Sequence, residues 1–116
     1  MTCQCIYNGP SLIIAYSHCI AHGYDLRHGL DQQKKAVLSG YWPLYRYHPD
    51  VDHTGKSGMT LDSKAPSLPL AEYMYAETRF KLLTQTRPAE AERLLALAKE
   101  DVAERWKTYE RLAAQA

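Results

Sequence analysis

The residues best suited to chemistry in this 116-residue sequence are its cysteines and the histidines beside one of them. Cys3 and Cys5 form a C-x-C pair, and Cys19 and His22 follow at C-x-x-H spacing, so these four side chains are a candidate zinc site. The alternative is inert thiols, because a free cysteine behaves as a small apolar residue. In that interpretation Cys19 is simply a small buried residue at the end of a strand.

An iron–sulfur cluster makes a different demand on the same residues. A [4Fe-4S] cluster is normally held by four cysteine thiolates, whereas this sequence has 3 cysteines and no C-x-x-C pair. We therefore expect that the isolated chain holds no intact cluster.

The composition is that of an ordinary globular protein, with 14 basic and 13 acidic side chains and a net charge of +1. There is no basic excess for an electrostatic nucleic-acid surface. The longest apolar run in the N-terminal half, residues 12–16, is far shorter than the ~20 residues of a membrane helix, and no basic stretch precedes it as in an export signal. We expect a soluble, cytoplasmic protein that binds neither nucleic acid nor a membrane.

The hydrophobic pattern predicts an α+β fold with one buried, parallel-type strand. Residues 12–16 are continuously apolar, which is typical of a strand covered on both faces. The loop that follows, residues 17–23, carries Cys19 and two histidines, at the end of the strand where ligands gather in open parallel sheets. Residues 25–38 then predict a helix that stops near Gly40.

The rest of the chain predicts a short aromatic hairpin and two long C-terminal helices. Residues 44–47 are flanked by prolines, which favours a short edge strand, and residues 59–61 are its candidate partner. One helix is expected from Pro69 to about Thr84, and another from Pro88 onward. The stripe of the first helix is Leu70, Tyr73, Met74, Glu77, Phe80 and Leu83. The stripe of the second is Leu95, Ala98, Val102, Trp106, Tyr109 and Leu112.

A single buried strand raises a difficulty for a chain of this length. Residues 12–16 require neighbours on both edges, and a parallel neighbour needs a crossover of about a dozen residues or more. An unpaired apolar strand is an aggregation hazard. The chain therefore resembles the last part of a larger sheet domain.

Several separate segments carry a resemblance to a known family, and they occur in the family's order. They are GPSLIIAYSHCIAHGYD (9–25), DQQK (31–34), SGYWPLYRY (39–47), LDSKAP (61–66) and YMYAETRF (73–80). Together they closely resemble the C-terminal end of pyruvate:ferredoxin (flavodoxin) oxidoreductase. The similarity begins at about residue 9, and residues 1–8 are an atypical lead-in.

The resemblance implies a function, a domain and a site. The family oxidatively decarboxylates pyruvate to acetyl-CoA with thiamine diphosphate, Mg²⁺ and [4Fe-4S] clusters, and passes electrons to ferredoxin or flavodoxin. Residues 9–116 correspond to the C-terminal part of the last thiamine-diphosphate-binding domain, incomplete on its own. By resemblance, Cys19 is a ligand of the cluster nearest the thiamine, and we expect no catalytic residue in this chain.

The sequence also departs from the family's requirements. The other three cluster ligands and the Gly-Asp-Gly…Asn pattern for magnesium and diphosphate are missing. We therefore expect a fragment or truncated form that needs the remainder of the oxidoreductase or a complementary chain, and that is inactive and free of cofactors alone. The alternatives are a stand-alone helical docking module and the small zinc-binding protein described above.

Three groups near the motifs have both a functional and an ordinary interpretation. His18 and His22 are candidate hydrogen-bond donors to cluster sulfurs, but we favour bonds to backbone carbonyls. The aromatic residues 41–47 are candidates for stacking on bases, but without a basic groove we favour packing. Arg79 is expected to be solvated or ion-paired.

Overall fold

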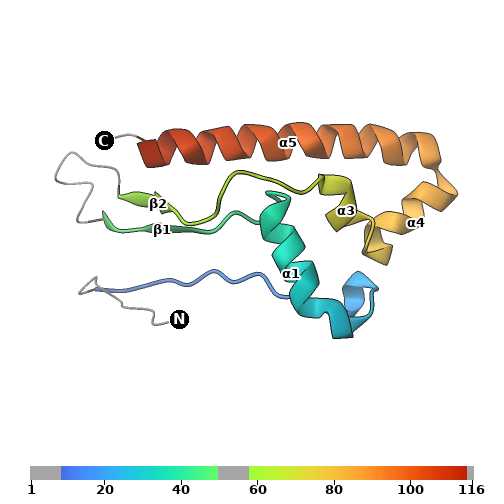
Figure 1. The fold of residues 1–116 in the computed structure, drawn as a ribbon, viewed down its shortest axis with the longest axis horizontal. Coiled ribbons are helices and arrows are strands. Elements are labelled where there is room, and N and C mark those ends of the chain that lie inside the picture. Colours follow the sequence, from blue (N-terminus) through green and yellow to red (C-terminus); the bar gives the residue numbers. More distant parts are fainter. Residues whose placement is uncertain (1–8, 50–57, 115–116) are drawn as a thin grey trace.

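The computed structural model describes residues 9–49 and 58–114. The chain forms an α+β fold with a two-stranded antiparallel sheet, which confirms the predicted class at that level (Figure 1). The elements are η1 (Ile20–His22), η2 (Leu26–His28), α1 (Gly29–Leu38), β1 (Tyr45–Tyr47), β2 (Met59–Leu61), α3 (Leu70–Met74), α4 (Thr78–Thr86) and α5 (Pro88–Ala114). The predicted lead-in, residues 1–8, lies outside the described residues.

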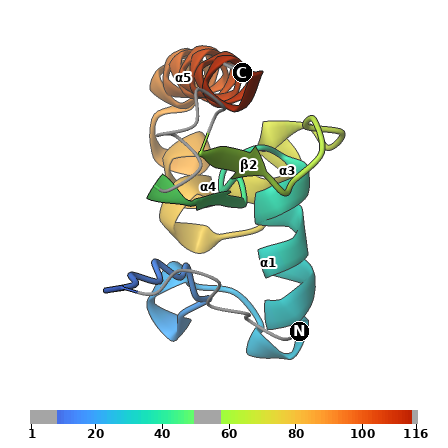
Figure 2. The same ribbon diagram turned by 90° about the vertical axis from the view of Figure 1, so that its left-hand side faces the viewer.

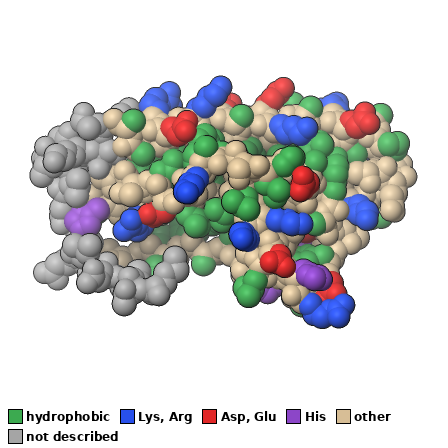
Figure 3. Space-filling model, viewed as in Figure 1, with side chains coloured by type: hydrophobic (Ala, Val, Ile, Leu, Met, Phe, Trp, Pro, Cys, Tyr) green, Lys and Arg blue, Asp and Glu red, His purple; other side chains and the backbone are tan. Residues whose placement is uncertain are grey.

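The long helix α5 forms one side of the molecule, and the segment that leads into η1 lies on the opposite side (Figures 1 and 2). The hairpin β1–β2 and the helices α3 and α4 lie between them. Hydrophobic side chains gather across the middle of the face drawn in Figure 3, while basic and acidic side chains are interspersed around them. None of the described helices combines the length and the apolar composition needed to cross a membrane.

The buried core joins α1 to α3. Ala36, Leu70 and Tyr73 are buried together, and the ring centroids of Tyr73 and Tyr41 lie 4.6 Å apart. Burial of apolar area stabilises the fold by about 25 cal/mol per Å², so these contacts fix the two helices against each other. The partly buried side chains around this core are Tyr16, Tyr41, Trp42, Met74, Ala98 and Val102.

The predicted buried strand at residues 12–16 is wrong for the described chain. No strand is assigned there, and Leu12, Ile13 and Ile14 are 85%, 76% and 69% exposed. The physical reason is the lack of a partner: the described strands β1 and β2 pair with each other, with Arg46 opposite Thr60. An extended segment without a neighbour cannot form ladder hydrogen bonds or cover its side chains.

The predicted helix over residues 25–38 is present, but its first turn is a 3₁₀ helix. The side chain of Asp25 accepts a hydrogen bond from the backbone N–H of Arg27 and so caps η2, and α1 continues from Gly29. The chain leaves α1 at Gly40, whose φ of +73° is left-handed. A Cβ atom at Gly40 would lie 2.7 Å from Cγ of Pro66, so the position favours glycine twice over.

The predicted aromatic hairpin is confirmed, with β1 one residue shorter than expected. The single helix predicted from Pro69 to Thr84 is wrong, because α3 ends at Met74 and α4 begins at Thr78. Between them Glu77 is extended (φ −104°, ψ 130°), and the N–H of Thr78 bonds the carbonyl of Gly23 instead of continuing a helix. A tertiary contact therefore overrides the helical pattern at this point.

The second long helix begins at Pro88, as predicted, and continues for 27 residues as α5. Ala91 and Trp106 are its buried residues, while Leu112 at the end of the predicted stripe is exposed. Arg105 donates from Nη2 to the carbonyl of Tyr41 at 2.9 Å. This bond ties α5 to the turn that follows α1.

Candidate functional site

The structure places Cys19 on an exposed loop, as a free thiol. Cys19 is extended (φ −144°, ψ 145°) and immediately precedes η1, and its carbonyl accepts a hydrogen bond from the N–H of His22 at 3.0 Å. The interpretation of Cys19 as a small buried residue is therefore wrong, because the residue lies at the surface.

The described part of the chain contains no complete set of metal ligands. Within residues 9–49 and 58–114 there is no group of three or more His, Cys, Asp or Glu side chains arranged to hold one. Cys3 and Cys5, the other cysteines of the zinc hypothesis, lie outside the described residues. Cys19 alone offers one exposed thiol, which is fewer ligands than a whole metal site requires.

The loop that carries Cys19 begins at Tyr16, which is bound on several sides. The Tyr16 hydroxyl oxygen lies 2.9 Å from that of Tyr73 and accepts a hydrogen bond from Nη2 of Arg79 at 2.8 Å. Its ring stacks on Trp42, with centroids 5.2 Å apart, and on His22, with centroids 6.1 Å apart. Tyr16 is therefore half-buried and fixed, although the residues before it are exposed.

A buried carboxylate lies behind the loop. Glu77 is 1% exposed, and its Oε1 accepts a hydrogen bond of 2.9 Å from Nε2 of Gln32, while its Oε2 accepts one of 2.5 Å from Nε of Arg79. Nδ1 of His22 lies 3.9 Å from Oε1. A carboxylate removed from water needs such partners, because an unpaired buried charge is strongly destabilising.

Burial and hydrogen bonding shift two pKa values in this cluster. Burial of Tyr73, followed by its hydrogen bond to Tyr16 and the charge of Glu77, raises the pKa of Tyr73 well above that of a free tyrosine. Burial alone would lower the pKa of Arg79, but the hydrogen bond and charge of Glu77 outweigh it and raise that pKa. Tyr73 is thus a neutral hydroxyl and Arg79 a permanent cation at ordinary pH.

The loop ends at Gly23, where α4 begins to run alongside it. Gly23 has a φ of +72°, and its carbonyl accepts hydrogen bonds from both the N–H and the hydroxyl of Thr78. A Cβ atom on Gly23 would lie 2.7 Å from Cβ of Thr78. Glycine therefore permits both the left-handed turn and the close approach.

The two histidines beside Cys19 pack instead of bonding carbonyls through Nδ1. Nδ1 of His18 and Nδ1 of His22 are buried and have no hydrogen-bond partner among the described residues. The His18 ring lies so close to Gly29 that a Cβ there would be 2.7 Å from its Nε2. For Nδ1, the expectation of backbone-carbonyl partners is therefore wrong.

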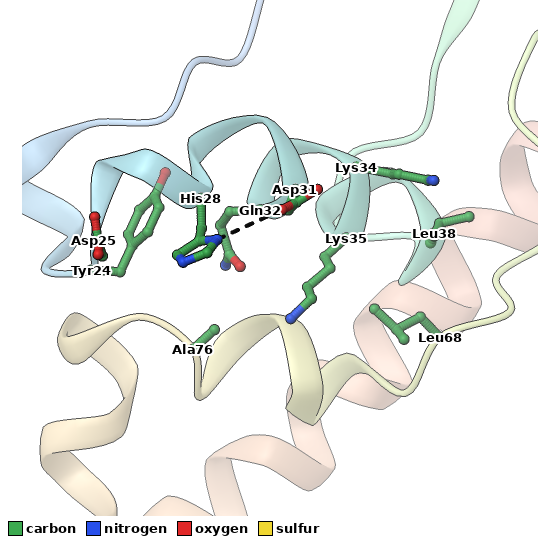
Figure 4. A pocket seen from close by; sticks show the side chains of 10 residues that line it. All are labelled: Tyr24, Asp25, His28, Asp31, Gln32, Lys34, Lys35, Leu38, Leu68 and Ala76. Carbon is green, nitrogen blue, oxygen red and sulfur yellow. Dashed lines mark ion pairs between the residues drawn. The ribbon is translucent and has the colours of Figure 1, made fainter.

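A separate open cleft of about 450 Å³ lies between α1 and the segment around α3 (Figure 4). In it Lys35 extends from α1 toward α3, and His28 and Asp31 form an ion pair at 3.8 Å. Burial, and then the charge of Glu77, raise the pKa of Tyr24 at its rim. The cleft does not include Cys19, and its lining carries both signs of charge, so we assign no ligand to it.

The sequence missed most of the network around Glu77. Gln32, Tyr73 and Glu77 were treated as helix positions, whereas the expected ion pairing of Arg79 is confirmed. One signal was visible in the sequence: Glu77 is a carboxylate in an otherwise apolar stripe. Such a residue is rarely buried without partners, and its partners then mark an organised polar site.

Comparison with known proteins shows which proteins this chain is similar to. No family model matches it. Over 109 residues, or 94% of this chain, it is 56% identical to a pyruvate-flavodoxin oxidoreductase from Trichormus variabilis. It is 50% identical over 107 residues to the enzyme of the same name from Rhodospirillum rubrum, and 43% identical over 107 residues to a pyruvate:ferredoxin oxidoreductase from Moorella thermoacetica.

These relatives are oxidoreductases, and their names combine pyruvate with flavodoxin or ferredoxin. The chain is homologous to one segment of the pyruvate-flavodoxin oxidoreductases, as the sequence motifs implied. It spans about 9% of the length of each of these relatives.

Proposed function

We propose that this chain serves as one structural segment of a pyruvate:ferredoxin or pyruvate-flavodoxin oxidoreductase and contributes the thiolate of Cys19 to a [4Fe-4S] cluster. In this role it corresponds to the C-terminal part of a thiamine-diphosphate-binding domain, and other chain supplies the remaining ligands. The reaction of the complete enzyme would be oxidative decarboxylation of pyruvate, with electrons leaving to ferredoxin or flavodoxin.

One observation of the geometry carries this proposal. An extended apolar segment, 69–85% exposed at Leu12, Ile13 and Ile14, leads directly into the loop that presents the Cys19 thiol. Its exposed side chains fit a strand that enters a sheet formed by other chain, because apolar strands of this kind are covered on both faces in parallel sheets. In such a sheet the loop of Cys19 would lie at a strand end, where ligands gather.

The cofactors are divided between this chain and the rest of the enzyme in the proposal. An exposed thiolate on a loop fixed by neighbouring side chains suits one ligand of a cluster, which would supply electron transfer when bound. Thiamine diphosphate and Mg²⁺ would be held elsewhere, since none of the 6 glycines of this sequence lies in a Gly-Asp-Gly pattern.

The proposal is tested by replacing the matching segment of the Trichormus variabilis relative with residues 9–116 of this chain. We expect the chimera to retain the iron content and the low-temperature electron paramagnetic resonance signals of the parent enzyme. Cys19→Ala in the chimera should lose the iron and the signal of one cluster. Ser17→Ala is the matched control, because Ser17 is an exposed residue of the same loop, and it should retain both.

Two results would contradict the proposal. A chimera that folds but lacks a cluster present in the parent would show that this segment does not replace its counterpart. Full iron content in the Cys19→Ala chimera would remove Cys19 from the ligand set.

A further inference from the structure

Three consecutive residues hold the Cys19 loop: Glu77 is the last residue of the break between α3 and α4, and Thr78 and Arg79 begin α4. Thr78 holds the C-terminal end of the loop. Its N–H donates to the Gly23 carbonyl at 3.0 Å, and its hydroxyl donates to the same oxygen. Because Gly23 has no Cβ, its backbone lies directly against the Thr78 side chain. Thr78 therefore fixes the backbone four positions after Cys19.

Arg79 holds the N-terminal end of the loop. Its Nη2 donates to the Tyr16 hydroxyl at 2.8 Å, and the Tyr16 hydroxyl also lies 2.9 Å from that of Tyr73. Gln33 adds a long hydrogen bond of 3.4 Å to the Tyr16 carbonyl. The backbone three positions before Cys19 is thus fixed as well.

Glu77 supports the contact between Arg79 and Tyr16 from inside the molecule. It orients Arg79 through their hydrogen bond, and its Oε1 faces Nδ1 of His22 at 3.9 Å. The His22 ring in turn lies against the ring of Tyr16, with an interplanar angle of 14°. Between these contacts Cys19 and Ile20 are exposed, so the loop is held at both ends while the Cys19 side chain remains accessible at the surface.

We propose that Glu77, Thr78 and Arg79 are positioning residues that hold the Cys19 thiol in a fixed place at the surface before any ligand binds. This inference rests on the proposed role of Cys19 and names the residues that serve it. A ligand on a fixed loop loses less conformational freedom when a cluster or partner is bound, which is the advantage of preorganisation. The arrangement also explains why the helix is broken at this point: α3 and α4 as one helix would not bring residues 77–79 to the loop in this way.

The test uses the full chain with Cys3→Ser and Cys5→Ser, so that a nitroxide spin label attaches to Cys19 alone. The resonance line shape of the label reports loop motion on the nanosecond scale. We expect an immobilised component in this parent and its loss in Thr78→Val, which removes the hydroxyl but not the shape of the side chain. Thr78→Ser, which restores the hydroxyl, should restore the component.

Thr86→Val is the matched control, because the Thr86 hydroxyl also donates to a backbone carbonyl, that of Leu82, within α4 but away from the loop. It should keep the immobilised component. Tyr16→Phe independently tests the contact between Arg79 and the Tyr16 hydroxyl. This variant should lose the immobilised component even if Thr78→Val does not fold. Circular dichroism of each variant separates loop release from unfolding.

The inference is overturned if the label is already fully mobile in the parent. It is also overturned if folded Thr78→Val and Tyr16→Phe variants keep the immobilised component, or if Thr86→Val loses it to the same extent. These outcomes require no cluster and no partner. A failure here is therefore distinct from a failure of the iron measurement that tests the proposed function.

Discussion

The hydroxyl oxygens of Tyr16 and Tyr73 lie 2.9 Å apart, although 57 positions separate the two residues in the sequence. Tyr16 is the last residue of the extended segment, and Tyr73 is fully buried in α3. This contact joins a segment that is otherwise exposed to the centre of the described fold. It makes the tyrosine pair a sensitive place to test how the Cys19 loop is held.

Tyr73→Phe should destabilise the chain while leaving its fold intact. The change removes one hydroxyl from a hydrogen bond to Tyr16, and such a bond contributes about 1 kcal/mol to the free energy of unfolding. Denaturant unfolding followed by circular dichroism gives the measurement. Tyr45→Phe, on an exposed strand residue, is the control and should change the free energy of unfolding by less than about 0.5 kcal/mol. Equal effects of the two changes would contradict the importance of the buried pair.

The chain should lose stability in alkaline solution, and Tyr73 should account for part of that loss. Burial raises the pKa of Tyr73 in the folded state above the value of about 10 in the unfolded chain. The folded state therefore keeps its proton where the unfolded state releases one, so stability is unaffected below pH ~10 and falls as the pH rises above it.

The measurement for this prediction is the unfolding midpoint between neutral and strongly alkaline pH, compared between the parent and Tyr73→Phe. The variant should show a shallower decline above pH ~10, because it lacks the phenol that ionises on unfolding. Parallel curves for the two proteins would show that Tyr73 does not contribute.

Glu77→Ala should be more damaging than removal of an exposed carboxylate with the same kind of partner. The change leaves the guanidinium of Arg79 without its counter-charge and Nε2 of Gln32 with only the Tyr73 carbonyl as acceptor, at a cost of about 2 kcal/mol or more. Glu90→Ala is the matched control, since Glu90 pairs with Arg93 at 2.6 Å on the exposed side of α5. Thermal unfolding should shift strongly for Glu77→Ala and hardly at all for Glu90→Ala. A similar shift for both variants would show that the buried network adds nothing.

Polar substitutions in the extended segment should reduce self-association without lowering stability. Leu12→Ser with Ile14→Ser removes two side chains that are 85% and 69% exposed, so the folded state loses little buried area. Sedimentation velocity should show fewer oligomers than for the parent. Leu70→Ala, at a buried position, should instead cost about 2–5 kcal/mol. A large loss of stability in the serine variant would mean that the segment is packed within the chain.

Local sequence signals predicted the elements that stabilise themselves locally. The prolines around residues 44–47 and the apolar spacing after Pro88 were sufficient for β1 and α5, because hairpins and long amphipathic helices satisfy their own backbone groups. Residues 12–16 carried an equally clear strand pattern, yet a strand depends on a neighbour that the described chain does not provide. The pattern records the environment for which these side chains are suited, not the conformation of the isolated segment.

The sequence predicted the loop that carries Cys19 but missed the residues that hold this loop. Cys19 was placed on a loop after the apolar segment, and the structure agrees that it lies on a loop. The contacts of Thr78 and Arg79 with that loop join residues more than 50 positions apart, and no periodicity within one segment reveals such a contact. The break of the helix at Glu77 has the same origin, because it is set by where the loop lies.

In the proposed role, the exposure of Leu12, Ile13 and Ile14 separates the folding of this chain from its assembly with other chain. The core around Ala36, Leu70 and Tyr73 closes without these side chains, so docking of the apolar segment onto other chain would be a later event. Until it occurs, the chain displays the kind of extended apolar sequence to which chaperones and quality-control proteases bind. The supply of whatever covers this segment would then set how long the chain survives in a cell.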